Sequence, residues 1–196
     1  DWLFIIGWSQ IAKSELLNTP ALGCIGMHPT LLPVGRGRAA VPWAILKGLD
    51  RTGVTLFKLD EGVDTGDIIG QEMIALPETV TATELYERVN QAHISLIARY
   101  WDDVVSGNVS LHPQDAAAAT VWPGRRPEDG EITREMTMLE ADRMVRAVTH
   151  PYPGAFYREG DRILRIWSAR ASAESGRIPL RDGWLEPIDF QWEGRS

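Results

Sequence analysis

The sequence predicts an α/β protein with a second, small β-rich domain. Over residues 1–110, short apolar segments alternate with stretches of helical periodicity, an order that is typical of strands and helices packed in layers. After residue 110 the composition changes, and short strand-like segments separated by turn residues predominate. We therefore expect two domains, residues 1–110 and residues 111–196.

Strands and short helices are predicted to alternate in the first domain. The segments that are apolar, or that alternate in polarity, cover residues 3–6, 24–27, 52–60 and 68–76. The first is apolar at every position, as expected of a parallel strand covered on both faces. Short helices are predicted over residues 14–20 and 39–50. Pro20 closes the first helix, while Pro42 and Gly48 mark the two ends of the second.

A long amphipathic helix is predicted to complete the first domain. Thr81 and Glu84 have the spacing of a capping box, and Gly107 marks the carboxyl end. The apolar residues that recur at helical intervals between these ends are Leu85, Val89, Ala92, Leu96 and Tyr100. This stripe predicts a helix packed on the sheet.

The second domain is predicted to begin with an irregular segment over residues 112–130. Thr137 and Glu140 again have capping-box spacing and predict a short helix. The segments bounded by turn residues, which predict strands, are residues 155–169 and 182–188. The apolar and aromatic content of residues 183–192 leaves room for a homodimer contact.

Composition disfavours several classes of protein. The 196 residues are 44% hydrophobic, enough for a core, and a net charge of −7 disfavours a broad nucleic-acid surface. No segment approaches the roughly 18 apolar residues of a membrane helix, and the single cysteine, Cys24, forms no internal disulfide. We therefore expect a cytoplasmic protein without membrane contact. Because the sequence opens inside an apolar, strand-like run, we also expect a missing N-terminal portion that contributes to a ligand site.

His28 and Asp64 are the candidate catalytic residues. Both fall where a predicted strand gives way to a loop, and ligands collect at the carboxyl ends of strands in α/β sheets. Asp64 belongs to the acidic loop, residues 60–67 (DEGVDTGD), whose four acids in eight residues do not suit a core. Taken singly, such a histidine and aspartate are also common as hydrogen-bonded structural and turn residues.

The chemistry that this pair indicates is proton transfer. The sequence has no second histidine at metal-binding spacing, which disfavours a metal site. It also lacks a Gly-x-Ser-x-Gly elbow, which disfavours a serine nucleophile. An aspartate that orients a histidine allows the imidazole to move protons or to stabilise an oxyanion near neutral pH.

The segments that carry these residues resemble one family. IGMHPTLLPVGRGRAAVPWAILKG followed by TGVTLFKLDEGVDTGDII is similar to the folate-dependent formyltransferases, in which an Asn-x-His-x-Ser-Leu-Leu-Pro loop precedes an Asp-x-Gly-x-Asp-x-Gly loop. WPGRRPEDGEI and HPYPGAF extend the resemblance, here to methionyl-tRNA and sugar-nucleotide formyltransferases. The resemblance implies a Rossmann-like formyltransferase domain over residues 1–110, partial at its N-terminus, and a small β-rich C-terminal domain.

The resemblance implies catalytic roles for three positions. The family's histidine and aspartate fall on His28 and Asp64, and its asparagine falls on Gly26. By analogy, His28 stabilises the carbonyl oxygen and relays a proton, while Asp64 orients His28 and accepts the amine proton through water. In the family the asparagine amide helps to bind the oxyanion, and loss of one such donor costs about 2.7 to 4 kcal/mol. Gly26 is therefore the departure that bears on activity.

N10-formyltetrahydrofolate is the co-substrate that the resemblance implies, with no metal. Its pterin ring would lie between GWSQI, residues 7–11, and the acidic loop. The residues expected to line it are Trp8, Ser9, Gln10 and Ile11 on one side and Asp60, Gly62, Val63 and Asp64 on the other. Without the resemblance, GWSQI is equally typical of an ordinary strand-to-helix turn.

Four residues are candidates for binding the acceptor: Arg36, Arg38, Arg125 and Tyr152. Guanidinium groups match diphosphate geometry, and Tyr152 or Trp122 could stack on a base or sugar. For Arg36 and Arg38, solvation or pairing with the acidic loop is the alternative. The favoured acceptor is a nucleotide-linked amino sugar, carried on GDP or dTDP, for surface polysaccharide such as the O-antigen of lipopolysaccharide. Two alternatives stay open. One is methionyl-tRNA as the acceptor, which requires a positive track for phosphates. The other is a folate- or nucleotide-binding homologue with impaired turnover.

Overall fold

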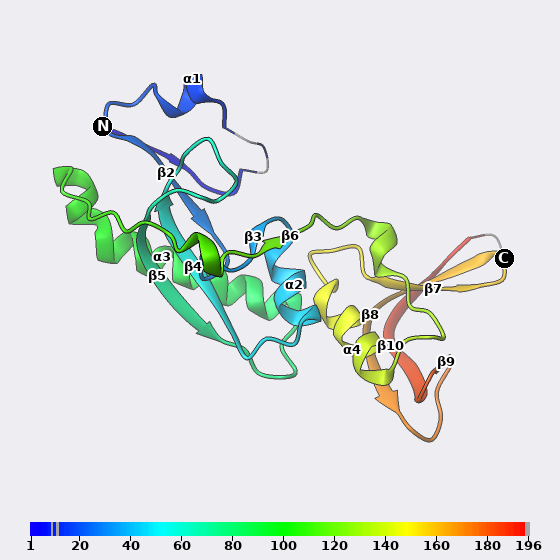
Figure 1. Cartoon of the computed structure of the whole chain (residues 1–196). Helices are drawn as coiled ribbons and strands as arrows, with labels where there is room; N and C mark the ends of the chain where they lie inside the picture. Colours follow the sequence, from blue (N-terminus) through cyan, green and yellow to red (C-terminus); the bar gives the residue numbers. More distant parts are fainter. Residues whose placement is uncertain (9, 11, 195–196) are drawn as a thin grey trace. The chain divides into compact units, whose positions relative to one another are not determined.

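The computed structural model describes residues 1–8, 10 and 12–194. The helices and strands form two compact units, and each unit gathers segments that are far apart in the sequence. Unit 1 comprises residues 1–40, 50–76 and 87–124; unit 2 comprises residues 41–49, 77–86 and the chain from residue 125 onward. Figure 1 follows the elements along the chain.

A four-stranded mixed sheet forms the centre of unit 1. In spatial order its strands are β1 (Trp2–Ile5), β2 (Gly23–His28), β4 (Arg51–Lys58) and β5 (Ile68–Ala75). β1 pairs with β2 in parallel, whereas β4 is antiparallel to both β2 and β5. The core includes Ile25, Leu56 and Phe57, each at most 2% exposed. The predicted alternation of strands and helices is thus confirmed, with an antiparallel hairpin, β4–β5, in half of the sheet.

Shorter elements complete unit 1. They are α1 (Ser14–Leu17), the parallel pair β3 (Arg36–Gly37) and β6 (Val121–Trp122), and the 3₁₀ turn η1 (Ala116–Ala118). Between β2 and β4 the chain forms α2 (Ala40–Leu46), which is shorter than the predicted range 39–50 and belongs to unit 2 from residue 41 onward. The first strand is parallel to β2, as predicted, but its side chains are not covered on both faces by the described residues. β1 is an edge strand, and Leu3 and Ile6 are 37% and 47% exposed.

The long helix α3 (Ala82–Ser106) is confirmed together with both of its predicted ends. The Thr81 hydroxyl accepts a hydrogen bond from the Glu84 amide, and the Glu84 carboxylate accepts one from the Thr81 amide. From residue 87 onward the helix belongs to unit 1, where the Tyr100 ring lies against Gly70 of β5. In the described part of the chain, no helix is both long enough and apolar enough to cross a membrane.

Unit 2 is built on an antiparallel sheet packed against one helix. The strands, in spatial order, are β7 (Ala155–Glu159), β8 (Arg162–Ser172), β10 (Gly183–Glu193) and β9 (Ile178–Leu180). The 3₁₀ turn η2 (Pro127–Gly130) precedes α4 (Met138–Ala147). Thr137 and Glu140 form the predicted capping box of α4. Ile188 and Phe190 are 62% and 44% exposed, and a homodimer contact there stays a prediction.

Candidate active site

His28 ends β2 as an enclosed side chain, 7% exposed. Its Nε2 atom lies 2.7 Å from the carbonyl oxygen of Gly35, and its Nδ1 atom lies 3.5 Å from Asp64 Oδ2. Because a carbonyl only accepts hydrogen bonds, the first contact keeps a proton on Nε2. The proton that this imidazole can gain or release is therefore the one on Nδ1, beside the carboxylate.

Asp64 reaches His28 by an unexpected route. Lys58, at the end of β4, pairs with Ile25, so β2 and β4 end at opposite edges of the sheet. The acidic loop instead brings Asp64 back to His28, and Asp64 has a left-handed backbone with φ 54°. Its Oδ2 atom also accepts a 2.8 Å hydrogen bond from the Gly37 amide.

Gly35 shapes the loop that follows His28. Its φ is +75°, and a Cβ there would lie 2.9 Å from the Trp122 ring. The position therefore requires glycine, both for backbone conformation and for space. Trp122 itself is 6% exposed, so its side chain is part of the core under this loop, and the suggestion that its ring stacks on a base or sugar is not supported.

Two residues that the sequence analysis did not single out bind the loop that follows His28. Thr55 of β4 is fully buried, and its hydroxyl donates to the Thr30 carbonyl at 2.7 Å and accepts from the Leu32 amide at 3.0 Å. Gln71 of β5 donates to the Thr55 hydroxyl at 2.9 Å and to the Leu32 carbonyl at 2.8 Å. Both belong to ordinary strand sequences, and only the fold shows that they meet the His28 loop.

The two arginines next to His28 have different surroundings. Arg36 is half-buried, and its Nε and Nη2 atoms donate to the Gln114 side-chain oxygen at 3.1 and 2.7 Å. Arg38 is exposed, with its side chain near Gly124. The Arg36 guanidinium makes these bonds to a neutral amide, so the bonds leave its positive charge uncompensated and able to attract an anionic ligand.

Gly26 faces an apolar side chain. A Cβ placed on Gly26 would lie 2.6 Å from Leu59 Cδ2, so the Leu59 side chain occupies the space next to this position. In this chain a methyl group stands where a side-chain amide would reach. Oxyanion stabilisation at this point would depend on backbone groups and on His28.

The residues predicted to line a pterin ring are mostly at the surface. Trp8 is 61% exposed and Val63 48% exposed, and Gln10 is exposed as well. Ser9 and Ile11 lie outside the described residues. The Asp60 carboxylate accepts hydrogen bonds from the Gly62 amide and the Thr65 hydroxyl, at 3.1 and 2.7 Å, which shapes the tip of the acidic loop.

Arg125 and Tyr152 belong to unit 2, where both have internal partners. Arg125 lies over the Trp43 ring and donates to the Asp129 carbonyl at 2.6 Å, and burial lowers its pKa. The Tyr152 hydroxyl lies 2.7 Å from that of Tyr86. Burial, and then this hydrogen bond, raise the pKa of Tyr152, so the phenol stays neutral. A role for either in binding the acceptor stays a prediction.

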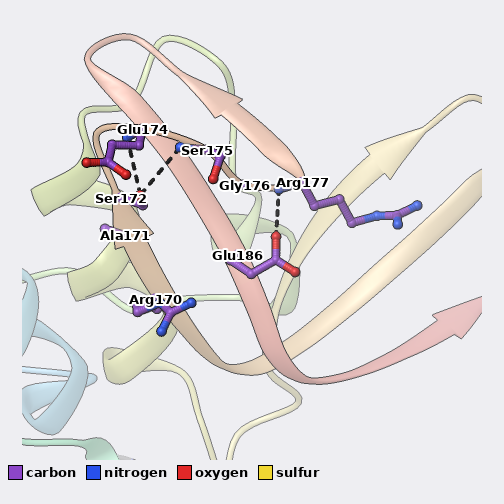
Figure 2. A pocket seen from close by; sticks show the side chains of 8 residues that line it. All are labelled: Arg170, Ala171, Ser172, Glu174, Ser175, Gly176, Arg177 and Glu186. Atoms are coloured by element: carbon purple, nitrogen blue, oxygen red, sulfur yellow. Dashed lines mark hydrogen bonds between the residues drawn. The ribbon is translucent and has the colours of Figure 1, made fainter.

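Among the described residues, no three His, Cys, Asp or Glu side chains are placed to hold a metal ion. Unit 2 has a cavity of about 800 Å³ lined by residues of β8, of β10 and of the segment between β8 and β9, which include Arg170, Arg177 and Glu186. Figure 2 shows the side chains that line it. None of the predicted site residues lines it.

Comparison with protein families identifies the chain. The formyl transferase model matches residues 1–100, more than half of the 196 residues, and the model for the formyl transferase C-terminal domain matches residues 125–192. The chain belongs to the formyl transferase family. The resemblance in the His28 and Asp64 segments is thereby confirmed, as is the two-part fold of this formyltransferase.

Solved structures share the fold of this formyltransferase. Methionyl-tRNA formyltransferase from Clostridium thermocellum is 23% identical with a TM-score of 0.73, covering 98% of this chain and 78% of that protein. HypX from Aquifex aeolicus in complex with tetrahydrofolic acid is 20% identical with a TM-score of 0.77, covering 91% and 31%. A sugar N-formyltransferase from Shewanella sp FDAARGOS_354 is 25% identical with a TM-score of 0.71, covering 82% and 65%. The chain spans less than two thirds of the last two proteins.

Proposed function

We propose that this formyltransferase moves a formyl group from N10-formyltetrahydrofolate to the amine of a nucleotide-linked amino sugar, carried on GDP or dTDP, for surface polysaccharide. The observation that carries the proposal is the His28–Asp64 pair, in which Nδ1 of an enclosed imidazole lies 3.5 Å from a carboxylate. This arrangement provides two adjacent proton acceptors without a nucleophile, as transfer to an amine requires.

Formyl transfer needs a base, a cation and an acid in sequence. The folate, when bound, supplies the activated formyl group. Asp64, whose side chain is 19% exposed, is within reach of solvent and can accept the amine proton through water, while it orients the His28 ring. Protonated on Nδ1, His28 can place a positive charge beside the formyl oxygen as that oxygen becomes negative. His28 can then give a proton to the departing N10, and the proton that Asp64 accepted from the amine can pass to His28 to replace it.

Exposed apolar side chains suit contact with a flat heteroaromatic ring. Trp8 and Val63 are among the exposed large hydrophobic residues, and such residues are typical of ligand contacts when they gather. The Ser14 hydroxyl donates to the Glu61 carboxylate at 2.6 Å, which ties the segment after Trp8 to the acidic loop. Trp8, Gly62 and Val63 are therefore the described residues proposed to hold the pterin.

Two observations support an amino-sugar acceptor. The Arg36 guanidinium is bonded to a neutral amide, so its charge can meet a phosphate. The chain also carries a net charge of −7, which does not suit a long nucleic-acid surface. The 25% identity with a sugar N-formyltransferase adds to both.

Methionyl-tRNA is the second candidate acceptor, favoured by one observation. The fold match to methionyl-tRNA formyltransferase extends over 98% of the chain, whereas the match to the sugar enzyme covers 82%. A folate- or nucleotide-binding protein with impaired turnover is the third candidate, because Leu59 fills the space beside Gly26.

A panel of acceptors separates the three candidates. The full-length protein is mixed with N10-formyltetrahydrofolate and with GDP- and dTDP-linked amino sugars or Met-tRNA, and tetrahydrofolate release and product mass are followed. A formylated sugar nucleotide supports the proposal. Transfer to Met-tRNA alone, falling steeply with added salt because phosphate contacts release counterions, supports the second candidate. Folate binding without transfer supports the third.

Variants test whether the His28–Asp64 pair is the catalytic centre. His28→Asn and Asp64→Asn are each expected to lower kcat by about a hundredfold to ten-thousandfold, the usual contribution of a positioned acid or base. His112→Asn is the matched control, because this exposed histidine pairs through its backbone with Ile68. Turnover that persists at the control's level in both variants would contradict the catalytic assignment.

A further inference from the structure

We propose that Gln114 is a positioning residue that holds the acidic loop, and with it Asp64, against β3. This inference rests on the proposed function for its kinetic consequences, but its structural part can be tested without turnover. Gln114 lies in the segment between α3 and η1, in unit 1, and carries no recognisable catalytic motif.

The side-chain amide of Gln114 uses its full hydrogen-bonding capacity. Its oxygen accepts from Arg36 Nε at 3.1 Å and from Arg36 Nη2 at 2.7 Å. Its nitrogen donates to the carbonyl oxygens of Asp64 and Gly66, at 2.9 and 2.7 Å. A primary amide offers two N–H donors and one oxygen with two lone pairs, so all four are occupied. Rotating the amide by half a turn would break every one of these bonds.

These bonds close a ring of contacts around Asp64. On the main-chain side, Gln114 binds the Asp64 carbonyl, and it links that carbonyl to Arg36 of β3. On the side-chain side, the amide of Gly37, the next residue of β3, donates to Asp64 Oδ2 at 2.8 Å. Asp64 is thus held at both ends, and the left-handed conformation with φ 54° is kept by these contacts.

Gln114 connects the proton relay, which is the His28–Asp64 pair, with the Arg36 guanidinium. Asp64 faces His28, and Arg36 is a candidate for binding an anionic acceptor. Because one amide bonds both, a change at Gln114 alters the position of the carboxylate relative to His28 even though Gln114 itself touches neither ring nitrogen. This is the mark of a positioning residue.

Gln114→Glu breaks the contact to the loop and keeps the bonds from Arg36, although the partner of Arg36 then becomes an anion. The new carboxylate still accepts from Arg36, but its second oxygen faces the carbonyls of Asp64 and Gly66, where the amide nitrogen donated. The carboxylate oxygen and these carbonyl oxygens repel each other, so we expect the acidic loop to move away from β3. The matched control is Gln91→Glu, the same change at an exposed position of α3.

Hydrogen exchange of three neighbouring amides measures the result directly. The Gly37 amide is bonded to Asp64, whereas the amides of Arg36 and Arg38 bond the carbonyls of Thr120 and Trp122 across the β3–β6 pair. In Gln114→Glu we expect Gly37 to exchange about two- to tenfold faster, the effect of losing one hydrogen bond. Arg36 and Arg38 should keep the rates found in Gln91→Glu.

Kinetic measurements then test whether the Gln114 contacts affect the proposed reaction. In Gln114→Glu, kcat per folded protein should fall by about a hundredfold, because a catalytic group is displaced on the ångström scale, while KM for the folate changes little. Unchanged Gly37 exchange, or equal acceleration at all three amides, would overturn the inference. So would unchanged kcat in a variant whose loop has moved. If the wild-type protein transfers no formyl group, the proposed function fails, and the exchange result still decides the role of Gln114.

Discussion

The space beside Gly26 offers a direct test of what this site lacks. Leu59 Cδ2 lies 2.6 Å from the position of a Cβ, at the far end of a flexible side chain. An asparagine at this position, with Leu59→Ala to make room, would place an amide donor near the reacting oxygen. We expect Gly26→Asn with Leu59→Ala to raise kcat about tenfold to a hundredfold over Leu59→Ala alone, less than the full value of one preorganised donor because the pocket was not built for it.

The control for this gain is Gly26→Ala with Leu59→Ala, which adds a side chain without a donor. Single-turnover kinetics with N10-formyltetrahydrofolate would compare the two at saturating acceptor. Equal rates in the alanine and asparagine variants would show that no donor is missing at residue 26.

Single residues also show where sequence reasoning reached its limit. His28 and Asp64 could be singled out because both fall where a predicted strand gives way to a loop and both belong to motifs that resemble those of the family. Thr55, Gln71 and Gln114 are neutral polar residues in segments without a motif, and their hydrogen bonds join positions 16 to 78 residues apart. No periodicity or composition records such contacts, which arise only when the sheet has formed.

Among the elements, β4 stabilises the loop after β2 through one hydroxyl. The Thr55 Oγ1 atom donates to the Thr30 carbonyl and accepts from the Leu32 amide, and Thr55 is fully buried. We expect Thr55→Val, which keeps the shape, to lower the free energy of unfolding by about 1 to 3 kcal/mol because buried polar groups lose their partner. Urea unfolding would measure this. Thr55→Ser keeps the hydroxyl and should recover most of the loss; a serine variant as unstable as the valine variant would refute the explanation.

Helix α3 carries a pH-dependent contribution to stability at His93, in unit 1. Burial lowers the pKa of His93 below 6.5, against a smaller opposing effect of a backbone hydrogen bond at Val89. Below pH 6.5 the unfolded chain therefore binds more protons at this residue than the folded chain, and the free energy of unfolding decreases as the pH falls through that range. Above pH 6.5, His93 no longer lowers the free energy of unfolding in this way.

His93→Gln should remove this part of the pH dependence. We expect the variant to lose less stability than the wild type when the pH is lowered from about 7 to about 5, as measured by urea unfolding at several pH values. The exposed His112, changed to Gln, should keep the wild-type slope. A His93→Gln profile that parallels the wild type would place the acid sensitivity elsewhere.

The whole molecule groups its segments differently from the order of the chain. The sequence placed a domain boundary near residue 110 because composition changes there, and the family match for the C-terminal domain begins at residue 125. By compactness, however, residues 41–49 and 77–86 join the chain beyond residue 125. Composition varies along the chain, whereas packing depends on which apolar faces meet. The strands, the helix caps and the long helix could therefore be predicted from the sequence, but the assignment of residues 41–49 and 77–86 to unit 2 could not.

This grouping predicts how a truncated chain folds. Within unit 2, the chain beyond residue 124 binds the two early segments in several places. Arg146 Nη1 donates to the Val80 carbonyl at 2.8 Å, the Thr83 hydroxyl donates to the His150 carbonyl at 2.6 Å, and Arg125 lies over the Trp43 ring. A fragment of residues 1–124 keeps the early segments but loses all three partners. The buried side chains of these segments include Val41, Ala44, Ile45, Val80 and Leu85, each at most 4% exposed in the whole chain.

We therefore expect the 1–124 fragment to expose apolar surface rather than fold as a complete domain. It should bind a dye for apolar surface, associate at micromolar concentration, and show less helix per residue than the whole chain, because helix α2 has lost its packing and short helices are unstable alone. Circular dichroism, dye fluorescence and light scattering on the fragment and the whole chain would measure this. A monomeric fragment with a single sharp unfolding transition and no dye binding would mean that unit 1 stabilises both segments without unit 2.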